Sequence, residues 1–188
     1  MDDTIAAGTD TTLRLWHRFE AAPERVFAAW TRPDALKLWW CPEGWYPTRI
    51  EVDLRPGGKY RLSMTRQNGA QSVAVHGSFL EIEPARRLVY TWRWDGAFAD
   101  MPETTVTVDF NSIGGGTELL LRQETLAMPF CVQHVSGWTA ALNRMTRIIH
   151  PPILQIRAAD AAAAGSPGDM TAIETRNAAS RKFACAAS

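Results

Sequence analysis

The chain has 188 residues, 46% of them hydrophobic, and its 20 Lys and Arg residues balance 20 Asp and Glu residues. This length and apolar content favour one domain with a well-buried core. The longest basic cluster is Arg86-Arg87, which disfavours nucleic-acid binding. Residues 1–10 lack the apolar core of a signal peptide, and no later apolar run reaches membrane-spanning length. The sequence therefore predicts a cytoplasmic protein without a membrane span.

The first element predicted is a strand over Leu13–Glu20, followed by two short helices between Pro23 and Trp40. Pro23 and Pro33 each suit a first helical position, where a missing amide hydrogen costs nothing. Alternating apolar residues separated by turn signals then predict six strands in an antiparallel meander. These strands are a hairpin around Pro56-Gly57-Gly58, with arms near Ile50–Leu54 and Tyr60–Met64, and the segments Ser72–Glu83, Arg87–Trp94, Thr104–Asn111 and Thr117–Thr125.

A long helix is predicted from about Phe130 to His150, where the apolar spacing changes to three and four residues. Pro151-Pro152 ends this helix. We therefore expect residues 1–10 to be a flexible N-terminus and residues 11–150 to form the domain. Residues 151–188 are rich in Ala, Ser and Gly, which predicts a tail that is disordered or weakly helical.

The three cysteines, Cys41, Cys131 and Cys185, are odd in number and lack a CxxC pair, so reduced thiols are expected. Cys131 and His134 are three residues apart near the start of the long helix, which permits a thiolate–imidazole pair. Two ligands are too few for zinc, and no Walker loop, dinucleotide fingerprint or nucleophile elbow is present. The sequence therefore assigns no metal, no cofactor and no catalytic residue.

Several motifs in a fixed order resemble one family, the AHSA-type proteins, named after activators of heat-shock-protein ATPase, within the SRPBCC or START-like superfamily. The resemblance covers roughly Leu13 to His150. The motifs that carry it are FEAAP (Phe19–Pro23), AWTRPDALKLWW (Ala29–Trp40), DLRPGG (Asp53–Gly58), GSFLEIEPARRLVYTW (Gly77–Trp92), GGGTELLL (Gly114–Leu121) and SGWTAALNRM (Ser136–Met145).

This resemblance implies an α+β fold of the helix-grip type, also called START-like or Bet v 1-like. Such a fold has a seven-stranded curved antiparallel sheet, two short helices and a long C-terminal helix. Between sheet and helix lies a cavity that often takes an apolar or amphipathic small molecule. Family members include lipid and hormone carriers, polyketide cyclases, self-sacrificing resistance proteins and chaperone regulators, so the function must be argued from the site.

The cavity candidates are large apolar residues on inward strand and helix positions, together with two polar residues at strand positions that are otherwise apolar. The polar ones are His76 and Gln123, and Gln123 is expected to be the polar anchor of the pocket. The full set of candidates is Trp40, Tyr60, Leu62, Met64, His76, Trp92, Trp94, Gln123, Trp138, Leu142 and Met145.

Three functions stay open at this point. The first is non-catalytic binding of an apolar or amphipathic small molecule, with a stress-response role left open. The second is an enzyme of cyclase or hydrolase type, for which His76, Tyr90 and Asp109 are the acid–base candidates. The third is a chaperone-regulator-like module that binds a protein partner. The sequence favours the first, leaves the oligomeric state open and does not identify the ligand.

Overall fold

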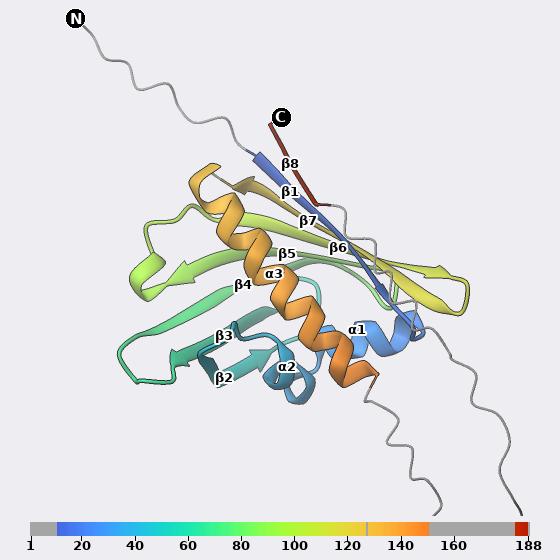
Figure 1. Ribbon diagram of the computed structural model, residues 1–188, viewed down its shortest axis with the longest axis horizontal. Coiled ribbons are helices and arrows are strands. Elements are labelled where there is room, and N and C mark those ends of the chain that lie inside the picture. The colour runs from blue at the N-terminus through green and yellow to red at the C-terminus, as the bar shows by residue number, and fades with distance from the viewer. Residues whose placement is uncertain (1–10, 127, 151–182, 188) are drawn as a thin grey trace, which may run out of the picture.

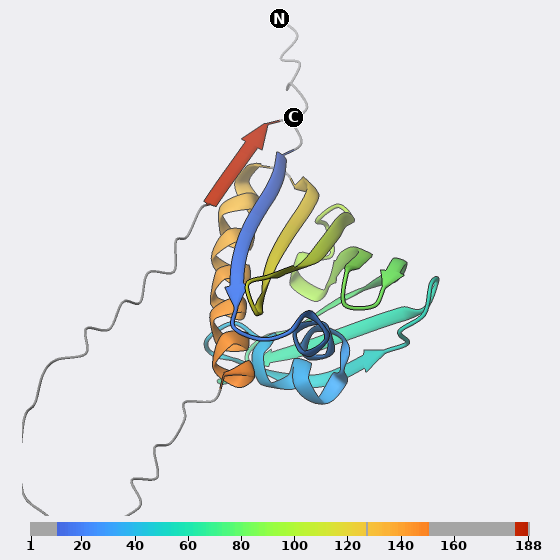
Figure 2. The same cartoon turned by 90° about the vertical axis from the view of Figure 1, so that its right-hand side faces the viewer.

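The fold is a curved antiparallel sheet that wraps around one long helix (Figures 1 and 2). The computed structural model describes residues 11–126, 128–150 and 183–187. The strands are β1 (Thr11–Phe19), β2 (Trp45–Val52), β3 (Lys59–Arg66), β4 (Ser72–Glu83), β5 (Arg87–Asp95), β6 (Thr104–Ile113), β7 (Gly116–Leu126) and β8 (Phe183–Ala187). The helices are α1 (Pro23–Thr31), α2 (Pro33–Trp39), a short 3₁₀ turn η1 (Gly96–Phe98) and α3 (Met128–Ile149).

The strand order β2-β3-β4-β5-β6-β7-β1-β8 confirms the predicted meander, with β1 returning beside β7. Both short helices begin at the expected prolines, Pro23 and Pro33. Helix α3 lies across the concave face of the sheet, and α1 and α2 lie near its C-terminal end (Figure 1). None of the helices in the described part of the chain combines the length and hydropathy that a bilayer span requires.

An eighth strand extends the predicted seven-stranded sheet at its β1 edge. The segment Phe183–Ala187 pairs antiparallel with β1, and Leu13 lies opposite Cys185. For these five residues the expectation of a disordered or weakly helical tail is wrong. The rest of that predicted tail, residues 151–182 and 188, and the predicted flexible N-terminus, residues 1–10, lie outside the described residues.

The two faces of the sheet differ in chemistry. The concave face packs a continuous apolar core against α1, α2 and α3. The convex face carries ion pairs, in which Asp109 contacts Arg87 at 2.7 Å and Arg122 at 3.4 Å. Because one face is buried and the other is solvated, each strand alternates between the two environments. Functional residues facing a cavity must therefore come from the concave face.

An irregularity in β4 changes which residues face the core. The pairing of β4 with β5 shifts register between Phe79 and Glu81. Val75 and Phe79 are buried before the shift, and Ile82 packs on the core after it. A bulge of this kind exchanges the two faces of a strand. Even-numbered residues such as Ile82 face the core after the shift, and even-numbered residues before it face away from the core. His76 therefore lies on the convex face.

We expect Gly77→Ala to destabilise the fold by about 1–3 kcal/mol or more, because overpacking against backbone forces the strands apart. A Cβ at Gly77 would collide with the backbone carbonyl of Thr91 on β5. The matched control is Gly137→Ala on α3, where a Cβ meets nothing within 4 Å and where helix propensity should add about 0.5–1 kcal/mol. Denaturant titration measures both, and equal stability of the two variants would contradict the close approach of β4 and β5.

Candidate ligand-binding cavity

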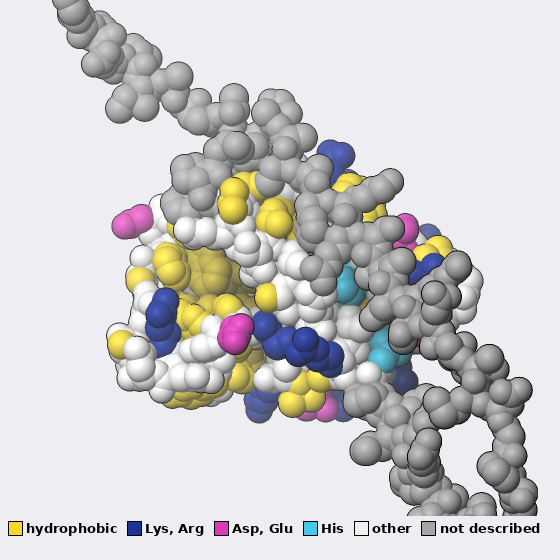
Figure 3. Space-filling view, viewed as in Figure 1, with side chains coloured by type: hydrophobic (Ala, Val, Ile, Leu, Met, Phe, Trp, Pro, Cys, Tyr) yellow, Lys and Arg dark blue, Asp and Glu magenta, His cyan; other side chains and the backbone are white. Residues whose placement is uncertain are grey.

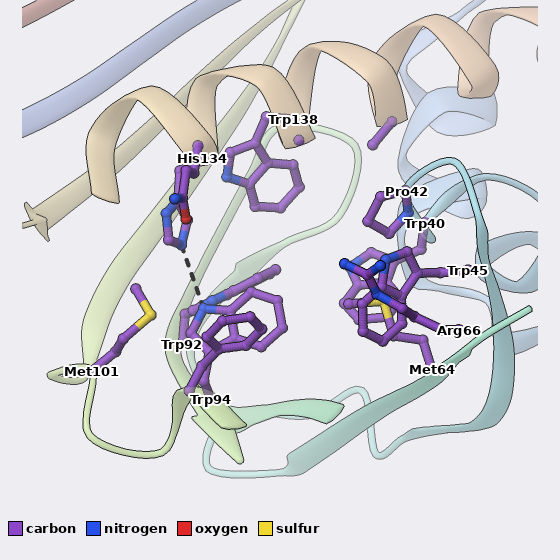
Figure 4. A pocket seen from close by; sticks show the side chains of 14 residues that line it. Trp40, Pro42, Trp45, Met64, Arg66, Trp92, Trp94, Met101, His134 and Trp138 are labelled. Carbon is purple, nitrogen blue, oxygen red and sulfur yellow. Dashed lines mark hydrogen bonds between the residues drawn. The ribbon is translucent and has the colours of Figure 1, made fainter. Parts of the chain in front are cut away.

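A cavity of about 260 Å³ lies under the N-terminal half of α3 and is open to the surface. Figure 3 shows a hollow lined with hydrophobic side chains on this face, and Figure 4 shows the side chains that surround it. Aromatic, methionine and small residues dominate the lining. The lining residues are Trp40, Pro42, Trp45, Met64, Arg66, Trp92, Trp94, Phe98, Met101, Gln133, His134, Gly137, Trp138 and Ala141.

One wall of the cavity comes from the hairpin β2–β3. Trp45 and Arg66 are cross-strand partners, and the guanidinium carbon of Arg66 lies 5.2 Å from the centroid of the Trp45 ring. A cation over an indole face is attracted by the ring quadrupole, which orients the Arg66 side chain. Arg66 is exposed at the rim, and Met64, two residues before it, contributes an apolar surface deeper in the wall.

The opposite wall comes from α3, which places Trp138 and His134 over the cavity (Figure 4). Trp138 is 5% exposed, and its ring stacks on Trp30 with the centroids 5.7 Å apart. Gly137 and Ala141 lie on the same side of the helix and contribute almost no side-chain volume. These two small residues leave the space that a ligand would fill.

The remaining wall comes from β5. The indole N–H of Trp94 donates a hydrogen bond of 3.4 Å to Nε2 of His134, which links β5 to α3. The indole N–H of its neighbour Trp92 is buried and finds no acceptor in the described part of the chain. A buried donor without a partner costs about 1–3 kcal/mol. Trp92 is therefore held by ring packing against Trp138, at 5.1 Å between centroids, and not through its N–H.

Gln123 fixes the position of Trp138 and does not line the cavity. Its side-chain oxygen accepts a 2.9 Å hydrogen bond from the Trp138 indole, and its nitrogen donates one of 2.8 Å to the hydroxyl of Thr104. Gln123 is fully buried. Since these two bonds use both ends of the amide, Gln123 positions a wall of the cavity instead of presenting a polar group to a ligand.

A second, smaller cavity of about 30 Å³ adjoins the first, and Trp40, Trp92 and Trp138 line both. Tyr60 and Tyr90 line it. Burial raises the pKa of both phenols well above the ordinary value of tyrosine. Each phenol is also hydrogen-bonded, with Tyr60 donating to the carbonyl of Thr91 at 2.7 Å.

Of the eleven predicted cavity residues, Gln123 lines neither cavity, and the other ten fall into three groups. Trp40, Met64, Trp92, Trp94 and Trp138 line the larger cavity. Tyr60 and Leu62 line the smaller one, and Leu142 and Met145 belong to the core below it. His76 lies on the convex face, where it contacts Asp95 at 3.1 Å.

Sequence reasoning missed the lining residues Trp45, Arg66, Gln133, His134 and Gly137, among others. On α3 the apolar stripe marks the face that packs in the core, whereas the cavity face is offset from it and carries small and polar side chains. A glycine beside a buried tryptophan in a helix was the available signal. Glycine destabilises a helix interior by about 1 kcal/mol relative to alanine. Open space for a ligand is one reason for a glycine at this position.

The acid–base candidates do not meet in the larger cavity. His76 contacts Asp95 and Asp109 pairs with Arg87, both on the convex face, and Tyr90 lies in the smaller cavity with a raised pKa. No group of three or more metal-binding side chains occurs among residues 11–126, 128–150 and 183–187.

The expected reduced state holds for Cys41 and not for Cys131. Cys131 is disulfide-bonded, so the expectation of reduced thiols is wrong there and no thiolate faces His134. Cys41 is a free thiol, and burial raises its pKa to about 12. Because the thiolate is the nucleophilic form, Cys41 is unsuited to nucleophilic chemistry at neutral pH.

Solved structures of bacterial proteins share this fold. A protein from Chromobacterium violaceum is 31% identical, with a TM-score of 0.69 over 74% of this chain and 97% of its own. The AHSA1 protein of Silicibacter pomeroyi is 26% identical, with a TM-score of 0.67 over 74% and 98%. An AHSA1-like protein from Aeromonas hydrophila is 25% identical, with a TM-score of 0.62 over 74% and 92%. A comparison with curated proteins gives no match.

The curved sheet, the gripped helix and the cavity between them define a helix-grip protein, a fold whose members generally bind hydrophobic ligands. Residues 20–150 match the model of one such family, described as Activator of Hsp90 ATPase homolog 1-like protein. The chain belongs to that family, which confirms the resemblance that the motifs indicated.

We expect Trp138→Ala to cost about 3–5 kcal/mol of stability, the usual range for truncating a buried aromatic residue. Gln123→Leu should lower the free energy of unfolding by about 1–3 kcal/mol, because it leaves the buried Trp138 N–H without its acceptor.

Denaturant titration measures the free energy of unfolding of both variants. Val132→Ala, on the exposed face of α3, is the control. A Gln123→Leu variant as stable as the unmodified protein would show that the Trp138 contact contributes nothing.

Proposed function

We propose that this protein binds an apolar or amphipathic small molecule in the larger cavity and performs no chemistry on it. The observation that supports the proposal is the lining itself: five tryptophans, two methionines and a phenylalanine surround a space that opens to the surface. Ligand sites are concave, mostly apolar and carry few polar groups. The family's general use of this fold for hydrophobic ligands points in the same direction.

The size of the cavity limits the ligand. Pockets for drug-sized molecules occupy about 300–1,000 Å³, and this cavity, at about 260 Å³, lies just below that range. A compound of two or three rings fits this size better than a long extended lipid chain. The adjoining cavity, which shares Trp40, Trp92 and Trp138 with this one, adds only about 30 Å³.

The test measures the binding of an apolar probe before and after a side chain on α3 fills the cavity. We expect the neutral probe N-phenyl-1-naphthylamine to bind with a Kd in the micromolar range, about −8 kcal/mol, and to quench tryptophan fluorescence. Gly137→Leu places a side chain in the cavity where a Cβ meets nothing within 4 Å, and should weaken binding at least about tenfold, or 1.4 kcal/mol. Gly137→Ala is the matched control and should bind like the unmodified protein.

Thermal melting shows whether each variant is folded. Leucine is a better helix former than glycine, so Gly137→Leu should fold at least as stably. The proposal is wrong if the folded protein binds no apolar probe at concentrations up to about 1 mM, where sites as weak as −4.1 kcal/mol are half filled. It is also wrong if Gly137→Leu binds the probe as tightly as Gly137→Ala.

A further inference from the structure

We propose that the ligand of the larger cavity is a flat aromatic anion, a small aromatic carboxylate, whose charged group pairs with Arg66 at the rim. This inference rests on the proposed function and adds the chemical class of the ligand. Two observations carry it: the charges of the lining residues and the nature of the walls.

The charges come first. Arg66 is the sole Lys or Arg residue among the fourteen that line the cavity, and the lining contains no Asp or Glu. Its guanidinium rests on Trp45 and takes no carboxylate partner in the described part of the chain. Glu43, which follows the lining residue Pro42, interacts electrostatically with Arg144. A ligand entering past Arg66 therefore meets a positive charge that is not neutralised by its neighbours.

Arg66 differs in its contacts from four other arginines of this protein. Arg49, Arg55, Arg61 and Arg87 each contact a carboxylate within 3.0 Å. Arg66 instead contacts an aromatic ring and lies at the mouth of an apolar cavity. A guanidinium presents several donors in a fixed plane that matches a carboxylate, so it favours this anion over a compact halide.

The walls favour a flat ring. The ring planes of Trp92 and Trp138 meet at 53°, and those of Trp92 and Trp94 at 80°. These walls offer both faces and edges of aromatic rings, which suit stacked and edge-to-face contacts with an aromatic guest. Met64 and Met101 add polarizable sulfur that packs well on aromatic rings. An alkyl chain would use the apolar area but not these directional contacts.

The experiment uses three planar probes of similar size and shape: the anion 2-naphthoate, the neutral 2-naphthamide and the cation 2-naphthamidinium. Binding to the full chain is measured by isothermal titration calorimetry at low salt. We expect naphthoate to bind about fivefold more tightly than naphthamide, the upper end for an exposed ion pair, and naphthamidinium to bind most weakly. At 1 M NaCl, where the Debye length falls to about 3 Å, the preference for naphthoate should shrink below about twofold.

Variants at the rim assign the effect to one residue. Arg66→Gln should remove the preference for naphthoate over naphthamide, and Arg66→Lys should keep part of it. The matched control is Arg93→Gln, which removes the same charge from β5 between Trp92 and Trp94, on the convex face. That variant should keep the preference within about twofold. Thermal melting confirms that all three variants fold.

Two results overturn the inference even if naphthoate binds. One is naphthamide or naphthamidinium binding as tightly as naphthoate, and the other is Arg93→Gln lowering the preference as much as Arg66→Gln. If N-phenyl-1-naphthylamine binds and naphthoate does not, the aromatic-anion class is wrong while the proposed binding function stands. If none of the four compounds binds the folded protein, the proposed function and this inference both fail.

Discussion

One buried chain of hydrogen bonds holds the helix against the sheet. The indole of Trp138 donates to Gln123 on β7, Gln123 donates to Thr104 at the start of β6, and the Thr104 hydroxyl donates to the carbonyl of Trp92 at 3.4 Å. Each group is buried. Since a buried donor or acceptor without a partner costs about 1–3 kcal/mol, this arrangement favours one placement of α3. The walls of the cavity that Trp138 and Trp92 provide depend on that placement.

The same arrangement separates residues that stabilise from residues that are free to bind. The side-chain amide of Gln123 is hydrogen-bonded to Thr104 and to Trp138. Arg66 stands at the rim with its charge unpaired by any described carboxylate. A polar group that is already satisfied gains little from a ligand, whereas an unpaired charge near an apolar surface gains more. Burial alone is therefore a poor guide to which polar residues of this cavity meet a ligand.

The sequence predicts the order of elements well because proline positions, turn signals and apolar periods are local. It does not predict β8, because Phe183–Ala187 is mostly alanine, which has a low strand propensity. It misplaces His76 because the register shift in β4 reverses the face, and one residue's offset cannot be seen in an alternating pattern. It misses Arg66 because the position of Arg66 at the cavity rim depends on its contact with Trp45. That contact arises only when β2 and β3 pair.

The two cavities show why the larger one is more than a packing defect. The smaller cavity, at about 30 Å³, has room for one or two water molecules and is lined mainly by core residues. A close-packed domain contains a few small voids of this kind. The larger cavity is nearly nine times that volume, and part of its space lies beside Gly137 of α3, where a Cβ would meet nothing within 4 Å. A chain shaped by stability alone would gain helix propensity and apolar contact by filling this space. A small residue opposite a wall of indoles is the arrangement that the proposed ligand site requires.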